Sequence, residues 1–138
     1  MRRDGFRMSE RDIHITICAL LDVYAHPRLI WFHPANGEKR NIVTAMRLKK
    51  MGVKRGIPDL VFTLPDGRSA YMEIKTPKGR MSDHQKYYRQ KCWDMNVPYA
   101  LVTDPDDAMA ILYEWGALLP VAWKSNKQTE QQRNGRDN

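Results

Sequence analysis

The stretch GIPDLVFTLPDGRSAYMEIKTP, residues 56–77, contains two short apolar runs on either side of a Pro-Asp-Gly turn signal. The runs have the length of strands, about 59–63 and 69–75, and the turn between them predicts a β-hairpin. Three charged residues, Asp59, Glu73 and Lys75, interrupt these runs. A buried charge costs free energy unless a partner compensates it, so a specific role is expected for each of the three.

The turn sequence LPDGR, residues 64–68, predicts which residues of the hairpin share a face. Proline suits the second position of a type I turn and glycine the left-handed position after it, which is typical of a three-residue loop with a glycine bulge. Counting outward from this loop, Asp59 lies opposite Glu73. The predicted polar face consists of Asp59, Val61, Tyr71, Glu73 and Lys75, and the predicted core face of Leu60, Phe62, Ala70, Met72 and Ile74.

Carboxylates that face each other across a hairpin repel, and a divalent cation would convert that repulsion into a pair of ligands. Magnesium binds one or two carboxylates and keeps waters for a phosphate substrate, while Lys75 could stabilise negative charge on that phosphate. The pattern favours metal-assisted phosphodiester hydrolysis. Two plainer interpretations stay open. Asp59 could be a turn residue beside a solvated Glu73–Lys75 ion pair, or a two-residue loop could put Asp59 and Glu73 on opposite faces.

The rest of the chain predicts one α/β domain with a mixed central sheet flanked by helices. We expect helices over 9–25, over 41–51, from Ser82 onward and over 104–116, and further strands at 29–32 and 98–103. This gives the order α-β-α-β-β-α-β-α. Residues 1–8 are interpreted as an extension, 9–123 as the domain, and 124–138 as a disordered polar tail because apolar residues are almost absent there.

The chain has 138 residues and a formal net charge of +7, and its two cysteines lie far apart in sequence. A basic domain favours polyanions such as nucleic acid, although many basic proteins bind nothing specific. The cysteine spacing fits neither a disulfide framework nor a zinc site, so a reducing interior is expected. No apolar run approaches the ~18 residues of a membrane span, and no membrane partner is expected.

The segments GIPDLVF and EIKTPKGRMSDHQ resemble the PD-(D/E)xK nuclease superfamily and, within it, the VRR-NUC domain in its small stand-alone form from phages and bacteria. The resemblance covers most of the chain and depends on the spacing of PD, ExK and the later SxxQ. It implies a restriction-endonuclease-like core and Mg²⁺- or Mn²⁺-dependent cleavage of DNA without an organic cofactor. It further implies a homodimer that resembles Holliday-junction resolvases and acts on branched DNA, in the cytoplasm of a bacterium or a phage-infected cell.

Carried over by position, the resemblance makes Asp59 and Glu73 metal ligands, adds the Ile74 backbone carbonyl, and makes Lys75 the catalytic lysine. It also implies a metal-binding glutamate on the first helix, which Glu10 matches. Helical periodicity supports Glu10 independently, because the apolar stripe of that helix extends back to it and points it inward. The alternative for Glu10 is a favourable interaction with the helix dipole in the first turn.

Gln85 also has two interpretations. The resemblance implies a glutamine near the metal site, and the apolar stripe of Tyr88, Cys92 and Met95 points Gln85 inward. The alternative is a capping box in which Gln85 bonds the backbone of Ser82.

Loop residues around the proposed site are candidates for DNA contacts. Histidine as a residue type titrates near neutrality, which invites a general-base role for His33, but a structural role or a contact with the substrate backbone is more common for such a residue. His84 and Tyr88 are further candidates. The basic residues that are either phosphate contacts or solvated surface charges are Arg40, Lys54, Arg55, Lys78 and Arg80.

Three functions follow from these patterns. The favoured one is a structure-selective DNA endonuclease for branched substrates. A flap- or nick-directed enzyme or a sequence-specific restriction-type enzyme is the second, although no segment resembles a recognition domain. A non-catalytic basic nucleic-acid-binding module is the third, against which the intact Asp59, Glu73 and Lys75 set argues.

Overall fold

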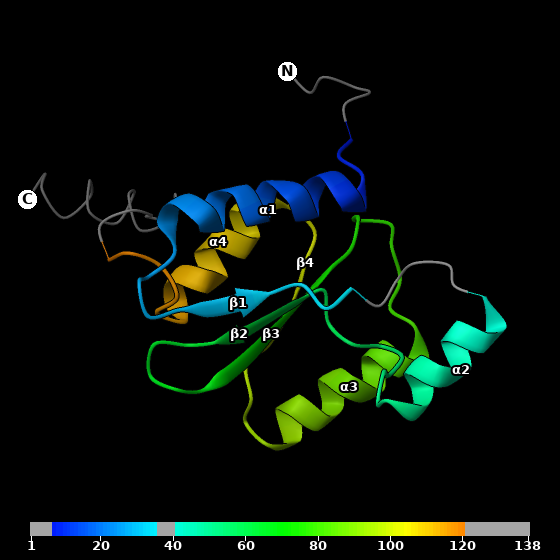
Figure 1. The fold of residues 1–138 in the computed structure, drawn as a ribbon. Coiled ribbons are helices and arrows are strands. Elements are labelled where there is room, and N and C mark those ends of the chain that lie inside the picture. The colour runs from blue at the N-terminus through cyan, green and yellow to red at the C-terminus, as the bar shows by residue number, and fades with distance from the viewer. Residues whose placement is uncertain (1–6, 36–40, 121–138) are drawn as a thin grey trace, which may run out of the picture.

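The computed structural model of the protein describes residues 7–35 and 41–120, in which helices and strands follow the predicted order (Figure 1). The elements are α1 Glu10–Tyr24, β1 Ile30–Phe32, α2 Ile42–Lys50, β2 Leu60–Thr63, β3 Ser69–Ile74, α3 Asp83–Asp94, β4 Tyr99–Val102 and α4 Pro105–Glu114. The predicted tail at 124–138 and Arg40 lie outside the described residues.

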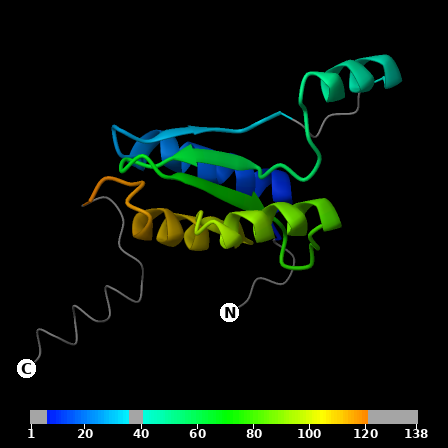
Figure 2. The ribbon, with the colours of Figure 1, turned by 90° about the horizontal axis from the view of Figure 1, so that it is seen from below.

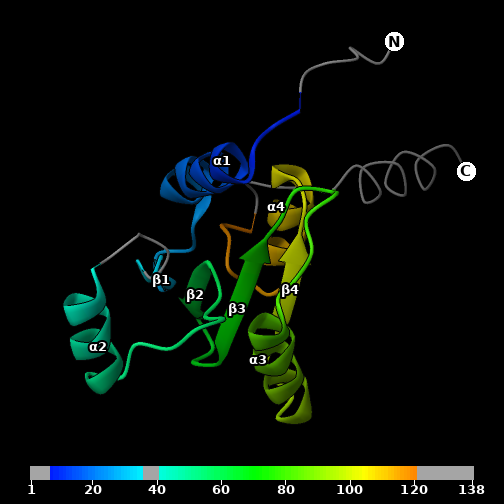
Figure 3. The ribbon, with the colours of Figure 1, turned by 90° about the vertical axis from the view of Figure 1, so that its right-hand side faces the viewer.

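The four strands form one sheet in the order β1-β2-β3-β4. β2 pairs antiparallel with both β1 and β3, whereas β3 and β4 are parallel, so the sheet is mixed as predicted. Parallel neighbours need a crossover connection, and α3 supplies it between β3 and β4 (Figure 3).

The β2–β3 hairpin has the predicted register, with Leu60 opposite Met72. Gly67 has a φ of +92°, a conformation that glycine adopts without a steric penalty. The Leu64 amide donates to the Arg68 carbonyl at 2.8 Å and closes a three-residue loop. The two-residue loop, which would have separated the two carboxylates, is thereby excluded.

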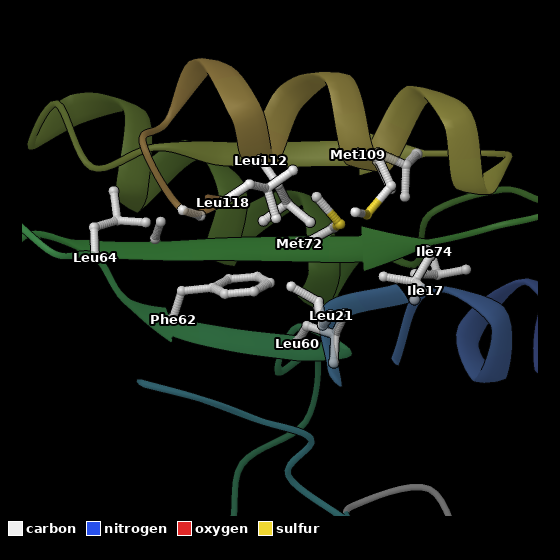
Figure 4. Packing of buried hydrophobic residues seen from close by; sticks show 14 of the residues in the cluster. Ile17, Leu21, Leu60, Phe62, Leu64, Met72, Ile74, Met109, Leu112 and Leu118 are labelled. Atoms are coloured by element: carbon white, nitrogen blue, oxygen red, sulfur yellow. The ribbon is translucent and has the colours of Figure 1, made fainter. Parts of the chain in front are cut away.

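The hydrophobic core lies between one face of the sheet and the helices α1 and α4 (Figure 4). Phe62 and Met72 of the predicted core face are buried there, and Ile17 of α1 and Leu112 of α4 pack into the same cluster. Each such side chain stabilises the fold by roughly 1.5–3 kcal/mol. The alternate residues of the hairpin must therefore point away from α1 and α4, toward the side on which α3 lies (Figure 3).

Polar side chains fix where the helices begin, which is why their starts were predictable. In each case the capping side chain accepts a hydrogen bond from a backbone amide three residues later, and such a cap contributes about 1 kcal/mol. The caps of α1, α2, α3 and α4 are Ser9, Asn41, Ser82 and Asp104. None of the helices within the described ranges combines the length and apolar character needed to cross a lipid bilayer.

The predicted inward stripe of α3 is confirmed for Cys92, which is buried, but wrong for Met95, which is 64% exposed. The helix ends at Asp94, and the Met95 amide bonds back to the carbonyls of Cys92 and Trp93. Met95 thus lies in the cap and no longer follows the helical period.

The helix α2 stands apart from the rest of the domain (Figures 1 and 2). It has no buried residue, and among the described residues its backbone does not approach another helix or strand. Ile42 and Val43 are 78% and 76% exposed, and Met46 is also exposed. An apolar surface on a helix that the domain does not cover is a candidate interface.

Candidate active site

Asp59 stands directly before β2, beside the carboxyl end of β3. Its Oδ2 accepts a hydrogen bond from the Ile74 amide at 2.8 Å. The antiparallel register of the hairpin would place Asp59 opposite Glu73. The hydrogen bond from the Ile74 amide holds the Asp59 carboxylate beside Glu73. A carboxylate oxygen has more than one acceptor site, so Asp59 can still serve as a ligand.

Glu73 is the one buried charged residue in the described part of the chain, at 1% exposure. Its Oε1 accepts a hydrogen bond from Gln85 Nε2 at 3.0 Å and lies 4.0 Å from Lys75 Nζ. Its Oε2 is buried and has no hydrogen-bond partner among the described residues. Burial, followed by the negative charge of Asp59, raises the pKa of Glu73 to about 9, and Glu10 adds a smaller effect.

Gln85 makes both the cap contact and a hydrogen bond to Glu73. Its Oε1 accepts from the Ser82 amide at 2.8 Å, and its own amide donates to Ser82 Oγ at 3.2 Å, which completes a capping box. Because Oε1 is used by the cap, the side-chain NH₂ must point the other way, and there it meets Glu73. The start of α3 thus orients a donor toward the buried carboxylate.

Glu10 and Lys75 complete the charged cluster from two sides. Glu10, the first residue of α1, is exposed rather than turned fully inward, and it lines the same cleft as Asp59 and Glu73. The Lys75 side chain is 14% exposed, follows β3 and lowers the pKa of Glu73. Asp59, Glu73 and Lys75 therefore lie together at the end of the hairpin, and Glu10 adds negative charge from the wall of the same cleft.

The donor set fits a hard divalent cation. An unpartnered buried carboxylate oxygen is costly, and burial beside the negative charge of Asp59 raises the pKa of Glu73 and disfavours its ionised form. Oxygen ligands from Glu10, Asp59 and Glu73 are the type that Mg²⁺ and Mn²⁺ accept. The Ile74 amide is bound to Asp59, and the predicted ligand role of the Ile74 carbonyl remains a prediction.

The carboxylates open into a cleft of about 1530 Å³ that extends between α2 and α3. This volume exceeds the ~300–1,000 Å³ of a small-molecule pocket and suits a larger substrate. The predicted contact residues that line it are His33, Lys54, Arg55, His84 and Tyr88. Lys78 and Arg80 are exposed in the loop after β3, outside this lining.

Sequence reasoning missed His14. It lies one helical turn after Glu10, and its ring packs edge-on against His33 with 4.4 Å between the ring centroids. Burial and the neighbouring His33 lower the pKa of His14, while Asp59 raises it by a smaller amount. The i, i+4 spacing from Glu10 was the available signal, since it places both side chains on one side of the helix.

Gly56 was missed as well. Its φ is +75°, and a Cβ added there would lie 2.5 Å from the backbone carbon of His84. The loop before Asp59 therefore approaches the start of α3 more closely than any side chain permits. A glycine three residues before the aspartate was the only trace of this contact in the sequence.

The model of the VRR-NUC domain family matches residues 12–104 of the chain. A solved structure described as a VRR_NUC domain protein aligns at 16% identity with a TM-score of 0.65, covering 80% of this chain and 89% of its own. This likeness confirms the restriction-endonuclease-like fold. A crystal structure of paFAN1 bound to 1-nt 5′-flap DNA with a gap matches at 35% identity over 33% of this chain and 8% of its own, with a TM-score of 0.30. Comparison with curated proteins gave no significant match.

Proposed function

Because the chain belongs to the VRR-NUC domain family and is therefore a nuclease domain, we propose that it is a Mg²⁺- or Mn²⁺-dependent endonuclease that hydrolyses the phosphodiester bonds of DNA. The observation that carries this proposal is the buried Glu73 Oε2, which has no hydrogen-bond partner in the described chain and is under the influence of the negative charges of Asp59 and, more weakly, Glu10. A structural carboxylate would be paired, whereas a ligand needs an available oxygen.

Glu10, Asp59, Glu73 and the Ile74 carbonyl would hold the cation. When bound, such an ion neutralises charge on the scissile phosphate and lowers the pKa of a coordinated water. The backbone amide of Ile74 donates to the Asp59 carboxylate, and the side-chain NH₂ of Gln85 donates to the Glu73 carboxylate. Both proposed ligands are therefore preorganised. Such fixed dipoles need little reorganisation during the reaction.

Lys75 is the proposed catalytic lysine. Its ammonium lies 4.0 Å from Glu73 Oε1 and is mostly shielded from solvent. A positive charge in that position stabilises negative charge that develops on the phosphate, or orients the attacking water. Loss of one such group typically lowers the rate by about 10²–10³-fold.

Positive charge around the cleft supports DNA as the substrate. Lys54 and Arg55 line the cleft, and Lys78 and Arg80 are exposed just beyond β3. Contacts of this kind bind phosphates without reading sequence, so binding should weaken steeply with salt. His33 at the edge of the cleft is proposed as a substrate contact.

We further propose that the protein is a homodimer and that its substrate is branched DNA. The exposed apolar residues Ile42, Val43 and Met46 of α2 would pair two copies, and a two-fold protein matches the symmetry of a four-way junction. The free cysteines Cys18 and Cys92 suit the reducing cytoplasm of a bacterium or a phage-infected cell. Met46→Asp should yield a folded monomer in sedimentation analysis, because the domain itself does not cover this residue.

The central experiment measures cleavage of labelled four-way junctions, flaps, nicked duplex and linear duplex with Mg²⁺ or Mn²⁺. Wild type is compared with Glu73→Gln and Lys75→Ala. The matched controls are Glu114→Gln and Arg28→Ala, which remove exposed charges at a distance from the cleft.

Cleavage by wild type and both controls, with loss in both site variants, is the expected result. Binding of DNA without cleavage in either metal would overturn the enzyme and favour a non-catalytic binding module. A preference for flaps or nicks over junctions would overturn only the junction part.

A further inference from the structure

A second set of metal-binding side chains lies beside the carboxylate cluster. His14 comes from α1, His33 from the loop after β1, and Asp59 from the residue before β2. One ligand atom from each lies within 4.8 Å of the other two. Three separate segments of the chain thus bring two imidazoles and a carboxylate together.

The hydrogen bond of His33 leaves it ready to act as a ligand. Its Nδ1 lies 2.6 Å from the backbone carbonyl oxygen of Asp59. A carbonyl only accepts, so Nδ1 is the donor, and in the neutral imidazole Nε2 then keeps its lone pair. A histidine that donates from one ring nitrogen to a backbone carbonyl and ligates through the other is the usual arrangement in metal sites.

We propose that His14, His33 and Asp59 form a binding site for a borderline transition-metal ion such as Zn²⁺ or Co²⁺, distinct from the oxygen-only set of the carboxylate cluster. Imidazole nitrogen suits these ions, whereas Mg²⁺ prefers oxygen ligands. Three protein ligands leave one position of a tetrahedral ion open.

Modest side-chain movement would complete this geometry. Metal–nitrogen bonds of about 2.0 Å place two ligands of a tetrahedral ion roughly 3.3 Å apart. His33 is exposed and His14 is half-buried, so both rings can turn toward Asp59 to close the gap.

Asp59 belongs to both sets, and this couples the two sites. Occupation of either one must change the affinity of the other, and by thermodynamic linkage the effect is reciprocal. The site stands on its own geometry and not on the nuclease activity. It can therefore be tested on the protein without DNA.

The test titrates Zn²⁺ into the metal-free protein by calorimetry and records the visible absorption of the Co²⁺-loaded protein. The variants are His14→Gln and His33→Asn, of which the second keeps a donor for the Asp59 carbonyl. His26→Asn is the matched control, since His26 lies just beyond the far end of α1, where its Nδ1 accepts a hydrogen bond from the Arg28 amide. Melting temperatures establish that each variant is folded.

The expected result is one Zn²⁺ per wild-type chain, at least a tenfold loss of affinity in both site variants, and no change in His26→Asn or in Glu73→Gln. The Co²⁺ protein should show the intense bands of four-coordinate cobalt, which excess Mg²⁺ does not abolish.

Equal Zn²⁺ affinity in wild type, His14→Gln and His33→Asn would overturn the proposal. So would a loss of Zn²⁺ binding in Glu73→Gln, which would place the ion in the carboxylate cluster, or a weak six-coordinate Co²⁺ spectrum. A failure of DNA cleavage would leave all these readouts intact, so the two proposals are tested separately.

Discussion

Gln85 Nε2 donates to Glu73 Oε1 while the same side chain caps α3 through Ser82. One residue thus contributes to helix stability and to the buried carboxylate. Ser82→Ala removes part of the cap and should cost about 1 kcal/mol with little effect on cleavage. Gln85→Ala removes the cap and the Glu73 contact together, so its cleavage rate should fall at least tenfold below that of Ser82→Ala. Equal rates in the two variants would show that the contact with Glu73 is structural only.

Glu73 should destabilise the metal-free fold as pH rises. Its pKa is about 9 in the folded chain against an ordinary value of 4.5. Below the lower value the group is neutral in both states, and no penalty arises. Between the two values the unfolded chain ionises while the folded chain keeps its proton, so the free energy of unfolding decreases with pH.

Glu73→Gln removes this titration. In EDTA it should melt above wild type, and the difference should grow across the neutral range and level off near the folded pKa. Glu114→Gln, at an exposed position on α4, should track wild type throughout. A difference in melting temperature between Glu73→Gln and wild type that stays constant at every pH would contradict the raised pKa of Glu73.

Asp59→Asn separates charge from structure. The new side-chain oxygen can still accept from the Ile74 amide, so the metal-free melting temperature should stay close to that of wild type. Mg²⁺ should raise the melting temperature of wild type but not of this variant, because binding to the native state alone stabilises it. Asp59→Ala should in addition lose about 1–3 kcal/mol, since a partly buried amide is left unpaired. An equal Mg²⁺ shift in wild type and Asp59→Asn would exclude Asp59 as a ligand.

The close approach of the loop to α3 at Gly56 can be tested with Gly52 as the matched control position. Both have positive φ, +75° and +97°, but a Cβ meets the His84 backbone only at Gly56 and nothing within 4 Å at Gly52. Gly52→Ala should therefore cost about 1 kcal/mol of conformational strain. Gly56→Ala should cost more, about 2–4 kcal/mol, and should also impair cleavage by shifting the segment that carries Asp59. Thermal unfolding of both variants measures the difference, and equal losses would mean that the loop relaxes freely.

The hairpin was predictable because residues close together in the sequence determine its register. The turn at 64–68 and the alternation of apolar residues determine it without distant contacts, and the structure has that register. The face that carries Glu73 followed directly. The burial of Glu73 could not be predicted in the same way, because α3, which comes later in the chain, covers this residue.

The contacts that sequence reasoning missed join segments far apart in the chain. His14 meets His33 across two elements, and Gly56 meets His84 across the hairpin. Periodicity describes one element at a time, so it placed Glu10 on the correct side of α1 but not its degree of exposure. For the same reason it extended the stripe of α3 to Met95, beyond the end of the helix.

The isolation of α2 has a consequence for the entropy of assembly. A helix of nine residues without a buried side chain is near the limit at which helices persist in water. Its amides should therefore exchange with deuterium faster than those of α1 or α4, and with a smaller opening free energy. Part of the binding free energy of a partner that covers Ile42 and Met46 is offset by the conformational entropy lost when α2 becomes ordered. Association would then be weaker than the apolar area alone indicates, and mutations that favour helix in α2 should tighten it without adding a contact.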